Sequence, residues 1–133
     1  MGLSRTEITL RNPRDHGLAP LTVSALVDTG ALHLCIPSHF AIQLKLDCLE
    51  QREVTTADGV RRLIDYVGPV EIRFGNRGCF TGALVLGDDI LLGAVPMEDS
   101  DLVVSPATRS VTVNSASPNI PTSSAKPLAF PGH

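Results

Sequence analysis

An apolar run near the start of the chain ends abruptly at an acidic residue. Residues 21–27, Leu-Thr-Val-Ser-Ala-Leu-Val, have the β-branched and aliphatic side chains of a buried strand. Asp28, Thr29, Gly30 and Ala31 follow directly. Because a lone carboxylate is too costly to bury, this order predicts a strand that delivers Asp28 to a rim or a cleft. Thr29 can hydrogen-bond there, and Gly30 permits backbone shapes that are closed to other residues.

The rest of the chain indicates short strands separated by turns. Alternating or continuously apolar segments, typical of strands, cover residues 7–11, 21–27, 33–36, 49–57, 60–74, 79–86, 102–104 and 110–113. Asp58-Gly59 is a strong signal for a two-residue hairpin turn. One short helix is expected at residues 39–44 with Ser38 as its cap, and a single helical turn can begin at Pro96. This pattern predicts a mostly β domain, either a closed barrel or a sandwich.

Length and composition limit the class of protein. A chain of 133 residues, 43% of them hydrophobic, is enough for one domain with an ordinary core. The net charge of −3, the 4% aromatic content and the absence of Trp argue against nucleic-acid binding. We expect no membrane span and no signal peptide, because no segment has the required apolar character. Three scattered cysteines indicate no disulfide framework, which predicts a cytoplasmic location.

The composition changes after residue 113. Four prolines lie among scattered Ser and Thr residues between positions 114 and 133, without any hydrophobic periodicity. Such composition is typical of an extended arm or a disordered tail. We therefore expect a folded domain at residues 1–113 and a tail at residues 114–133.

Two motifs and the hairpin between them carry a resemblance. The sequence Val-Asp-Thr-Gly-Ala at residues 27–31 resembles the active-site loop of retropepsin-like aspartic peptidases, and Ile-Leu-Leu-Gly at residues 90–93 is similar to the segment that this family places under that loop. The predicted hairpin at Asp58-Gly59 lies where the family has its flap. Residues 91–104 also resemble a small bacterial subgroup. Taken alone, Asp-Thr-Gly favours an Asx-type turn at a strand end, but the combination is more specific.

The resemblance implies a small closed all-β barrel with one short helix, followed by the Pro/Ser-rich tail. It implies an aspartic endopeptidase in which one carboxylate activates a water while a second, protonated carboxylate polarises the scissile carbonyl. Because the chain contains a single Asp-Thr-Gly, the second carboxylate would be Asp28 of another copy. A homodimer that binds a peptide or protein substrate, without a cofactor, is therefore expected.

The resemblance also assigns roles to individual residues. Asp28 would be the catalytic residue. The active-site loop would continue with Thr29, Gly30 and Ala31. The flap tip would be Ala57, Asp58 and Gly59, and the support under the loop would be Leu91, Leu92 and Gly93.

Leu32 departs from the family pattern, in which a short polar residue at this position commonly bonds the outer oxygen of the catalytic carboxylate. This departure leaves a second hypothesis open, a retropepsin-like dimeric module that binds peptides or has a structural role with little or no hydrolysis. A third is a plain β-barrel interaction domain, which would be a monomer. His33, Cys35, His39 and Cys48 match no familiar zinc spacing, so no metal site is predicted.

Overall fold

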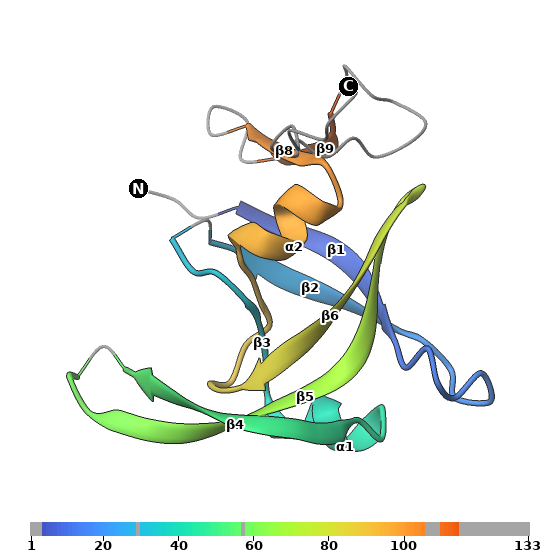
Figure 1. The fold of residues 1–133 in the computed structure, drawn as a ribbon. Coiled ribbons are helices and arrows are strands. Elements are labelled where there is room, and N and C mark those ends of the chain that lie inside the picture. Colours follow the sequence, from blue (N-terminus) through green and yellow to red (C-terminus); the bar gives the residue numbers. More distant parts are fainter. Residues whose placement is uncertain (1–3, 29, 57, 106–109, 115–133) are drawn as a thin grey trace, which may run out of the picture.

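The structure, a computed structural model, describes residues 4–28, 30–56, 58–105 and 110–114 (Figure 1). In this part of the chain the elements are, in order, β1 (Ser4–Arg11), β2 (Leu21–Val27), β3 (Leu34–Ile36), α1 (Ser38–Gln43), β4 (Asp47–Thr55), β5 (Arg61–Phe74), β6 (Arg77–Val85), β7 (Leu91–Leu92), α2 (Ala94–Asp99), β8 (Leu102–Ser105) and β9 (Ser110–Val113). Nearly all of the predicted tail lies outside the described residues, so the predicted boundary at residue 113 stays a prediction.

Six strands close into a barrel. The strand order is β1-β2-β7-β3-β6-β5, and β1 also pairs with β5, which joins the two ends of the sheet. β4 pairs only with β5 and extends from the barrel as the outer strand of a hairpin. The predicted closed barrel is therefore confirmed, and the sandwich is excluded.

Aliphatic side chains fill the barrel. In β1 the inward positions Ile8 and Leu10 are buried, whereas Glu7 is exposed and Thr9 and Arg11 are only partly buried. This is the alternation expected of a strand with one face on the core. The other strands and α1 contribute further buried residues, among them Ala25, Val27, Leu34, Ile36, Ala41, Val70, Ile72, Ala83 and Leu92.

The strand β7 has only two residues, but it connects the two halves of the barrel. It pairs in parallel with the end of β2, where Leu26 lies opposite Leu91 and Val27 opposite Leu92. On its other side it pairs antiparallel with β3. The ends of β2 and β7 therefore lie side by side.

The hairpin between β4 and β5 differs from the predicted two-residue turn. The N–H of Thr56 donates to the carbonyl oxygen of Val60 at 3.0 Å, and the N–H of Gly59 donates to that of Thr56 at 2.9 Å. Gly59 has φ +80°, a left-handed conformation that suits glycine. The turn is therefore wider than predicted, because a left-handed Gly59 closes a longer loop. The predicted flap residue Ala57 lies outside the described residues.

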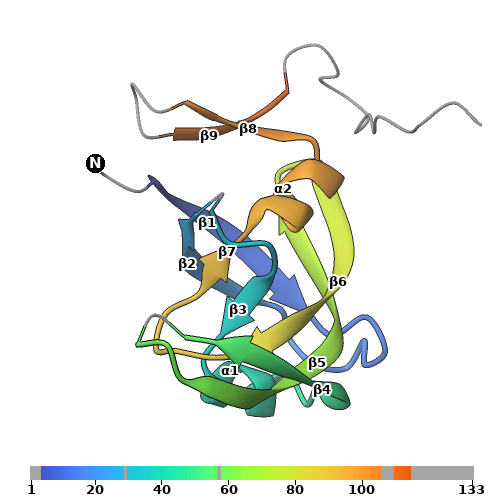
Figure 2. The same ribbon diagram turned by 60° about the vertical axis from the view of Figure 1, so that its left-hand side comes forward.

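The sequence predicted one short helix and a single helical turn beginning at Pro96, and the described part of the chain has a helix at each of the two places. α1 is where it was expected, but its cap is Pro37 without a side-chain hydrogen bond, so the prediction of Ser38 as the cap was wrong. α2 follows Gly93 and tolerates Pro96 in its first turn, where backbone N–H groups have no helical partner. The two helices lie at opposite ends of the barrel, and β8 and β9 form a separate two-stranded sheet beyond α2 (Figures 1 and 2).

Candidate active site

Asp28 follows β2 directly and lies beside the end of β7. Its N–H donates to the carbonyl oxygen of Leu92 at 3.1 Å, which continues the parallel ladder one residue beyond the strand. Asp28 is half-buried. The apolar strand thus ends at a partly accessible carboxylate, as its sequence predicted.

The backbone folds back onto Asp28 immediately after it. The N–H of Gly30 donates to Oδ1 of Asp28 at 2.9 Å, and the N–H of Ala31 donates to its carbonyl oxygen at 3.1 Å. A Cβ on Gly30 would lie 3.1 Å from Oδ1, so glycine leaves the carboxylate room. Locally this is the Asx-type turn that Asp-Thr-Gly favours, and the same turn fixes the direction of the carboxylate. Thr29 lies outside the described residues.

The segment after β7 lies against this loop. The N–H of Ala94 donates to the carbonyl oxygen of Ala31 at 2.8 Å. A Cβ on Gly93 would lie only 2.5 Å from the carbonyl oxygen of His33, so the two backbones touch. Leu92 is buried and Leu91 is half-buried. The three residues predicted as loop support therefore lie directly under or beside the Asp28 loop.

An apolar pair borders the same loop. The N–H of Val95 donates to the carbonyl oxygen of Leu32 at 2.9 Å, so the two residues are neighbours. The side chain of Leu32 is 63% exposed and that of Val95 is 46% exposed. Two large aliphatic side chains thus face solvent next to the candidate site.

This arrangement agrees with the comparison to known families. The model of a family described as "Aspartyl protease" matches residues 16–114, which span both the Asp28 loop and the segment under it. The chain belongs to the aspartyl protease family. No curated protein matches the sequence.

Solved structures of varying similarity match the chain. The retroviral protease-like domain of Ddi1 from Leishmania major has 13% identity and a TM-score of 0.54, and the match covers 86% of this chain and 91% of that one. EIAV protease has 20% identity and a TM-score of 0.49, with 74% and 88% covered. A retropepsin-like aspartic protease from Rickettsia conorii has 20% identity and a TM-score of 0.41, with 74% and 82% covered.

In this member of the family the tip of the β4–β5 hairpin is held by Asp58. Its Oδ1 accepts hydrogen bonds from the hydroxyl of Thr56 and, at 3.1 Å, from the N–H of Val60. Arg62 lies 3.5 Å from its other oxygen. The bond from Thr56 is the largest cause that lowers the pKa of Asp58 below its usual range, followed by the bond from Val60. At the predicted flap tip the Asp58 carboxylate thus connects Thr56 with Val60.

The structure adds a contact between the hairpin and the Asp28 loop that sequence reasoning missed. Nη1 of Arg52, on β4, lies 3.3 Å from Nε2 of His33, on the loop. The guanidinium carbon of Arg52 also lies 3.9 Å from the ring centroid of Tyr66, on β5. The predicted two-residue turn would pair position 52 with position 65 and place Tyr66 on the other face, whereas the observed register pairs Arg52 with Ile64 and Glu50 with Tyr66. Nothing in the sequence indicates that His33 joins them.

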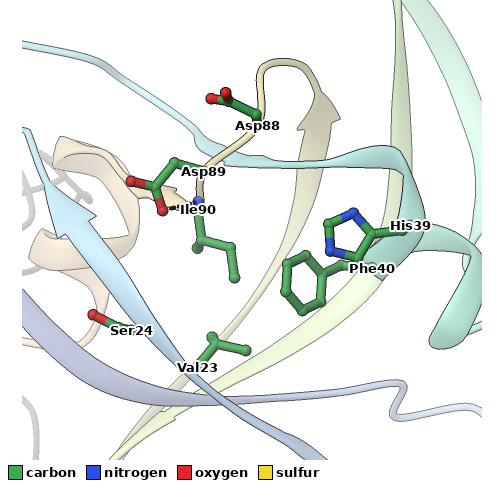
Figure 3. Close-up of a pocket in the computed structure, with 7 residues that line it drawn as sticks. All are labelled: Val23, Ser24, His39, Phe40, Asp88, Asp89 and Ile90. Atoms are coloured by element: carbon green, nitrogen blue, oxygen red, sulfur yellow. Dashed lines mark hydrogen bonds between the residues drawn. The ribbon is translucent and has the colours of Figure 1, made fainter.

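A hollow of about 380 Å³ lies between β2, α1 and the loop before β7 (Figure 3). Its lining residues are Val23, Ser24, His39, Phe40, Asp88, Asp89 and Ile90. Asp89 accepts two hydrogen bonds from the Arg5 guanidinium, at 2.9 and 3.0 Å, and one from the N–H of Ile90. The bonds from Arg5 are the main reason why the pKa of Asp89 lies below its usual range. Its carboxylate therefore serves to connect β1 with this loop.

Two further findings concern metals and membranes. Across the described ranges, no three His, Cys, Asp or Glu residues are grouped so that they could hold a metal ion. Of the cysteines weighed as metal ligands, Cys35 is buried on β3 and Cys48 is exposed on β4. Among the helices that the structure describes, none has the length and apolar character needed to cross a membrane.

Proposed function

We propose that this protein is an aspartic endopeptidase whose catalytic dyad forms from the Asp28 residues of two subunits in a homodimer. The observation that carries the proposal is the position of Asp28. It is a half-buried carboxylate at a strand end, oriented by the N–H of Gly30, in a chain with a single Asp-Thr-Gly and membership of the aspartyl protease family.

The mechanism follows from two carboxylates that share one proton. The ionised Asp28 takes a proton from a water, whose oxygen attacks the scissile carbonyl carbon, while the protonated Asp28 of the second subunit gives its proton to the carbonyl oxygen. The first Asp28 then passes its proton to the amide nitrogen as the C–N bond breaks, and the second takes a proton back from the intermediate, so that an acid and an amine leave and the dyad is restored. The pair titrates as a unit, so the roles exchange between the subunits. Gly30 restrains Oδ1. Within the part of the chain that is described, Oδ2 accepts no hydrogen bond and is available to the water and the shared proton.

Two features at the same end of the barrel support a homodimer. Leu32 and Val95 expose aliphatic side chains beside the Asp28 loop, which suits a covered position. The β8–β9 sheet lies beyond α2 and has only two strands. Because a two-stranded sheet is marginal alone, pairing with a second copy would stabilise it. In such a dimer Thr29 would bond across the axis, and the tip at Ala57, Asp58 and Gly59 would close over a bound peptide as a flap.

The first test compares the wild type with Asp28→Asn on a peptide library from acidic to neutral pH. The substitution keeps the shape of the side chain but removes the base, so turnover should fall by at least about 1,000-fold. Asp15→Asn is a matched control, because Asp15 also accepts a hydrogen bond from a glycine two residues on, at Gly17. The control should keep full turnover. Equal turnover by the wild type and Asp28→Asn would refute the proposal.

A second test addresses the shared dyad by mixing. When equal amounts of wild type and Asp28→Asn exchange subunits, the activity should fall to about half of that of the wild type alone. Half of the wild-type subunits then lie in mixed dimers, which have only one of the two catalytic carboxylates. Activity that stays at the level of the wild type alone would contradict a dyad built from two chains. Sedimentation of the mixture shows whether dimers are present.

The alternative is a dimeric retropepsin-like module without hydrolysis, and Leu32 is the observation that favours it. Its aliphatic, 63% exposed side chain cannot bond the carboxylate. A wild type that dimerises and binds peptides without turnover at any pH would support the alternative. Leu32→Ser then tests the reason for the missing turnover. A gain of turnover would show that the absent hydrogen bond to the carboxylate is the cause, and no gain would show that it is not.

A further inference from the structure

We propose that Arg52 is a positioning residue that connects the β4–β5 hairpin to the loop carrying Asp28, and that His33 breaks this connection when it takes up a proton. The inference deepens the proposed function, since it assigns a control of the hairpin that would act as the flap. The contact itself is independent of catalysis.

Arg52 lies at the centre of three contacts. Its Nη1 is 3.3 Å from Nε2 of His33, and its Nη2 is 3.2 Å from Oε1 of Glu50. Its guanidinium carbon lies 3.9 Å from the centroid of the Tyr66 ring. The side chain is 35% exposed, so part of this cation–π contact is shielded from water. One cation thus connects β4, β5 and the Asp28 loop.

Two glycines make room for the partners of Arg52. A Cβ on Gly82 would lie 2.3 Å from the Tyr66 ring, and the N–H of Gly82 donates to the Tyr66 hydroxyl at 3.2 Å. Gly93 presses against the backbone of His33, as described above. The ring that stacks on Arg52 and the loop that carries His33 are therefore both held in place by backbone.

The proton state of His33 decides whether the contact can exist. A guanidinium only donates hydrogen bonds, so Nε2 of His33 must accept, which requires a neutral ring with its proton on Nδ1. A second proton on Nε2 would leave two donors and two positive charges facing each other. Arg52 on β4 and Tyr66 on β5 are the groups that contact the imidazole, and Glu50 reaches only Arg52.

The hairpin is therefore connected to the Asp28 loop while the His33 ring is neutral and released when the ring takes up a second proton. Under the proposed function, release would open the cleft at the pH where His33 becomes charged.

Amide hydrogen exchange along β4 and β5 tests the inference, with rates corrected for their intrinsic dependence on pH. In the wild type, protection near the hairpin tip should fall by about threefold to tenfold as pH decreases, at the pH where the His33 ring signals titrate by NMR. His33→Gln should remove this step, because the amide oxygen accepts from Arg52 at every pH. Arg52→Met should show the low protection throughout.

His16→Gln is the matched control, because His16 lies on an exposed loop outside the contact. It should keep the wild-type step. The same step in His33→Gln, or full protection in Arg52→Met, would overturn the inference. Exchange does not depend on turnover, so a failed peptidase assay leaves this result unaffected, and a failed exchange experiment leaves the Asp28 assay unaffected.

Discussion

At the scale of single residues, Gly93 is the position where the candidate site leaves the least room. A Cβ there would meet the backbone atoms of Leu32 and His33 at 2.5 to 2.7 Å, and backbone cannot swing away as a side chain tip can. Gly93→Ala should therefore lower the free energy of unfolding by about 2–4 kcal/mol, measured by urea denaturation. Gly17→Ala, on a loop where a Cβ would come no closer than 3.3 Å to Asp15, should change it by less than about 0.5 kcal/mol. Similar losses in both variants would contradict the argument.

The position of Asp28 at a strand end and the burial of Leu92 could be predicted because each is expressed in local pattern, whereas their roles in the site stay predictions. An apolar strand that ends in Asp-x-Gly predicts a carboxylate at a rim, and an apolar pair before glycine predicts buried support. His33 and Arg52 could not be paired in this way. Their contact depends on how the hairpin crosses the loop in three dimensions, and no periodicity in the chain reports that crossing. Their roles therefore became visible only with the structure.

At the scale of elements, Arg5 and Asp89 connect β1 to the loop before β7. The pKa of Asp89 is lowered mainly by its hydrogen bonds from Arg5, so the folded state binds its proton less readily than the unfolded state. The stabilisation is complete above the ordinary Asp pKa of about 3.9 and is lost as pH falls through the lower folded value.

Asp89→Asn should therefore decrease Tm by about 1–3 °C at pH 7, since both side chains are about half exposed and such pairs contribute little. The difference from the wild type should shrink as the pH is lowered below the ordinary Asp pKa of about 3.9. Asp88→Asn, at the exposed neighbouring position, should leave Tm unchanged at both pH values. Thermal unfolding followed by circular dichroism measures all three proteins. A Tm difference that stays constant with pH would rule out the ionic explanation.

The element pattern was largely predictable, and its errors have physical causes. β2 was predicted with its observed bounds, because a continuous apolar run is bordered by Pro20 and Asp28. The hairpin turn was predicted too short, because Asp58-Gly59 satisfies both a two-residue turn and a wider turn closed by a left-handed glycine. α1 was predicted, but Ser38 was assigned as its cap because of its residue type. In the structure Ser38 is the first residue of the helix and Pro37 is the cap.

At the scale of the whole molecule, the reactivity of the three cysteines tests whether the barrel opens. Cys35 and Cys79 are buried, and burial raises the pKa of both thiols, whereas Cys48 is exposed. A thiol reagent at pH 8 should therefore label one cysteine per chain rapidly in the native protein and all three in denaturant. Cys48→Ser should abolish the rapid reaction. Rapid labelling of a second cysteine would show that the barrel opens locally, which the packed interior argues against.

The closure of the barrel also has a consequence for the order in which the chain can fold during synthesis. β2 and β3 are neighbours only through β7, whose two residues lie at positions 91 and 92. Until that segment leaves the ribosome, both strands present unpaired edges, and the carboxylate at the end of β2 has no neighbour beneath it. Two leucines at positions 91 and 92 therefore complete the sheet and the floor of the candidate site only after the other five barrel strands have been synthesised.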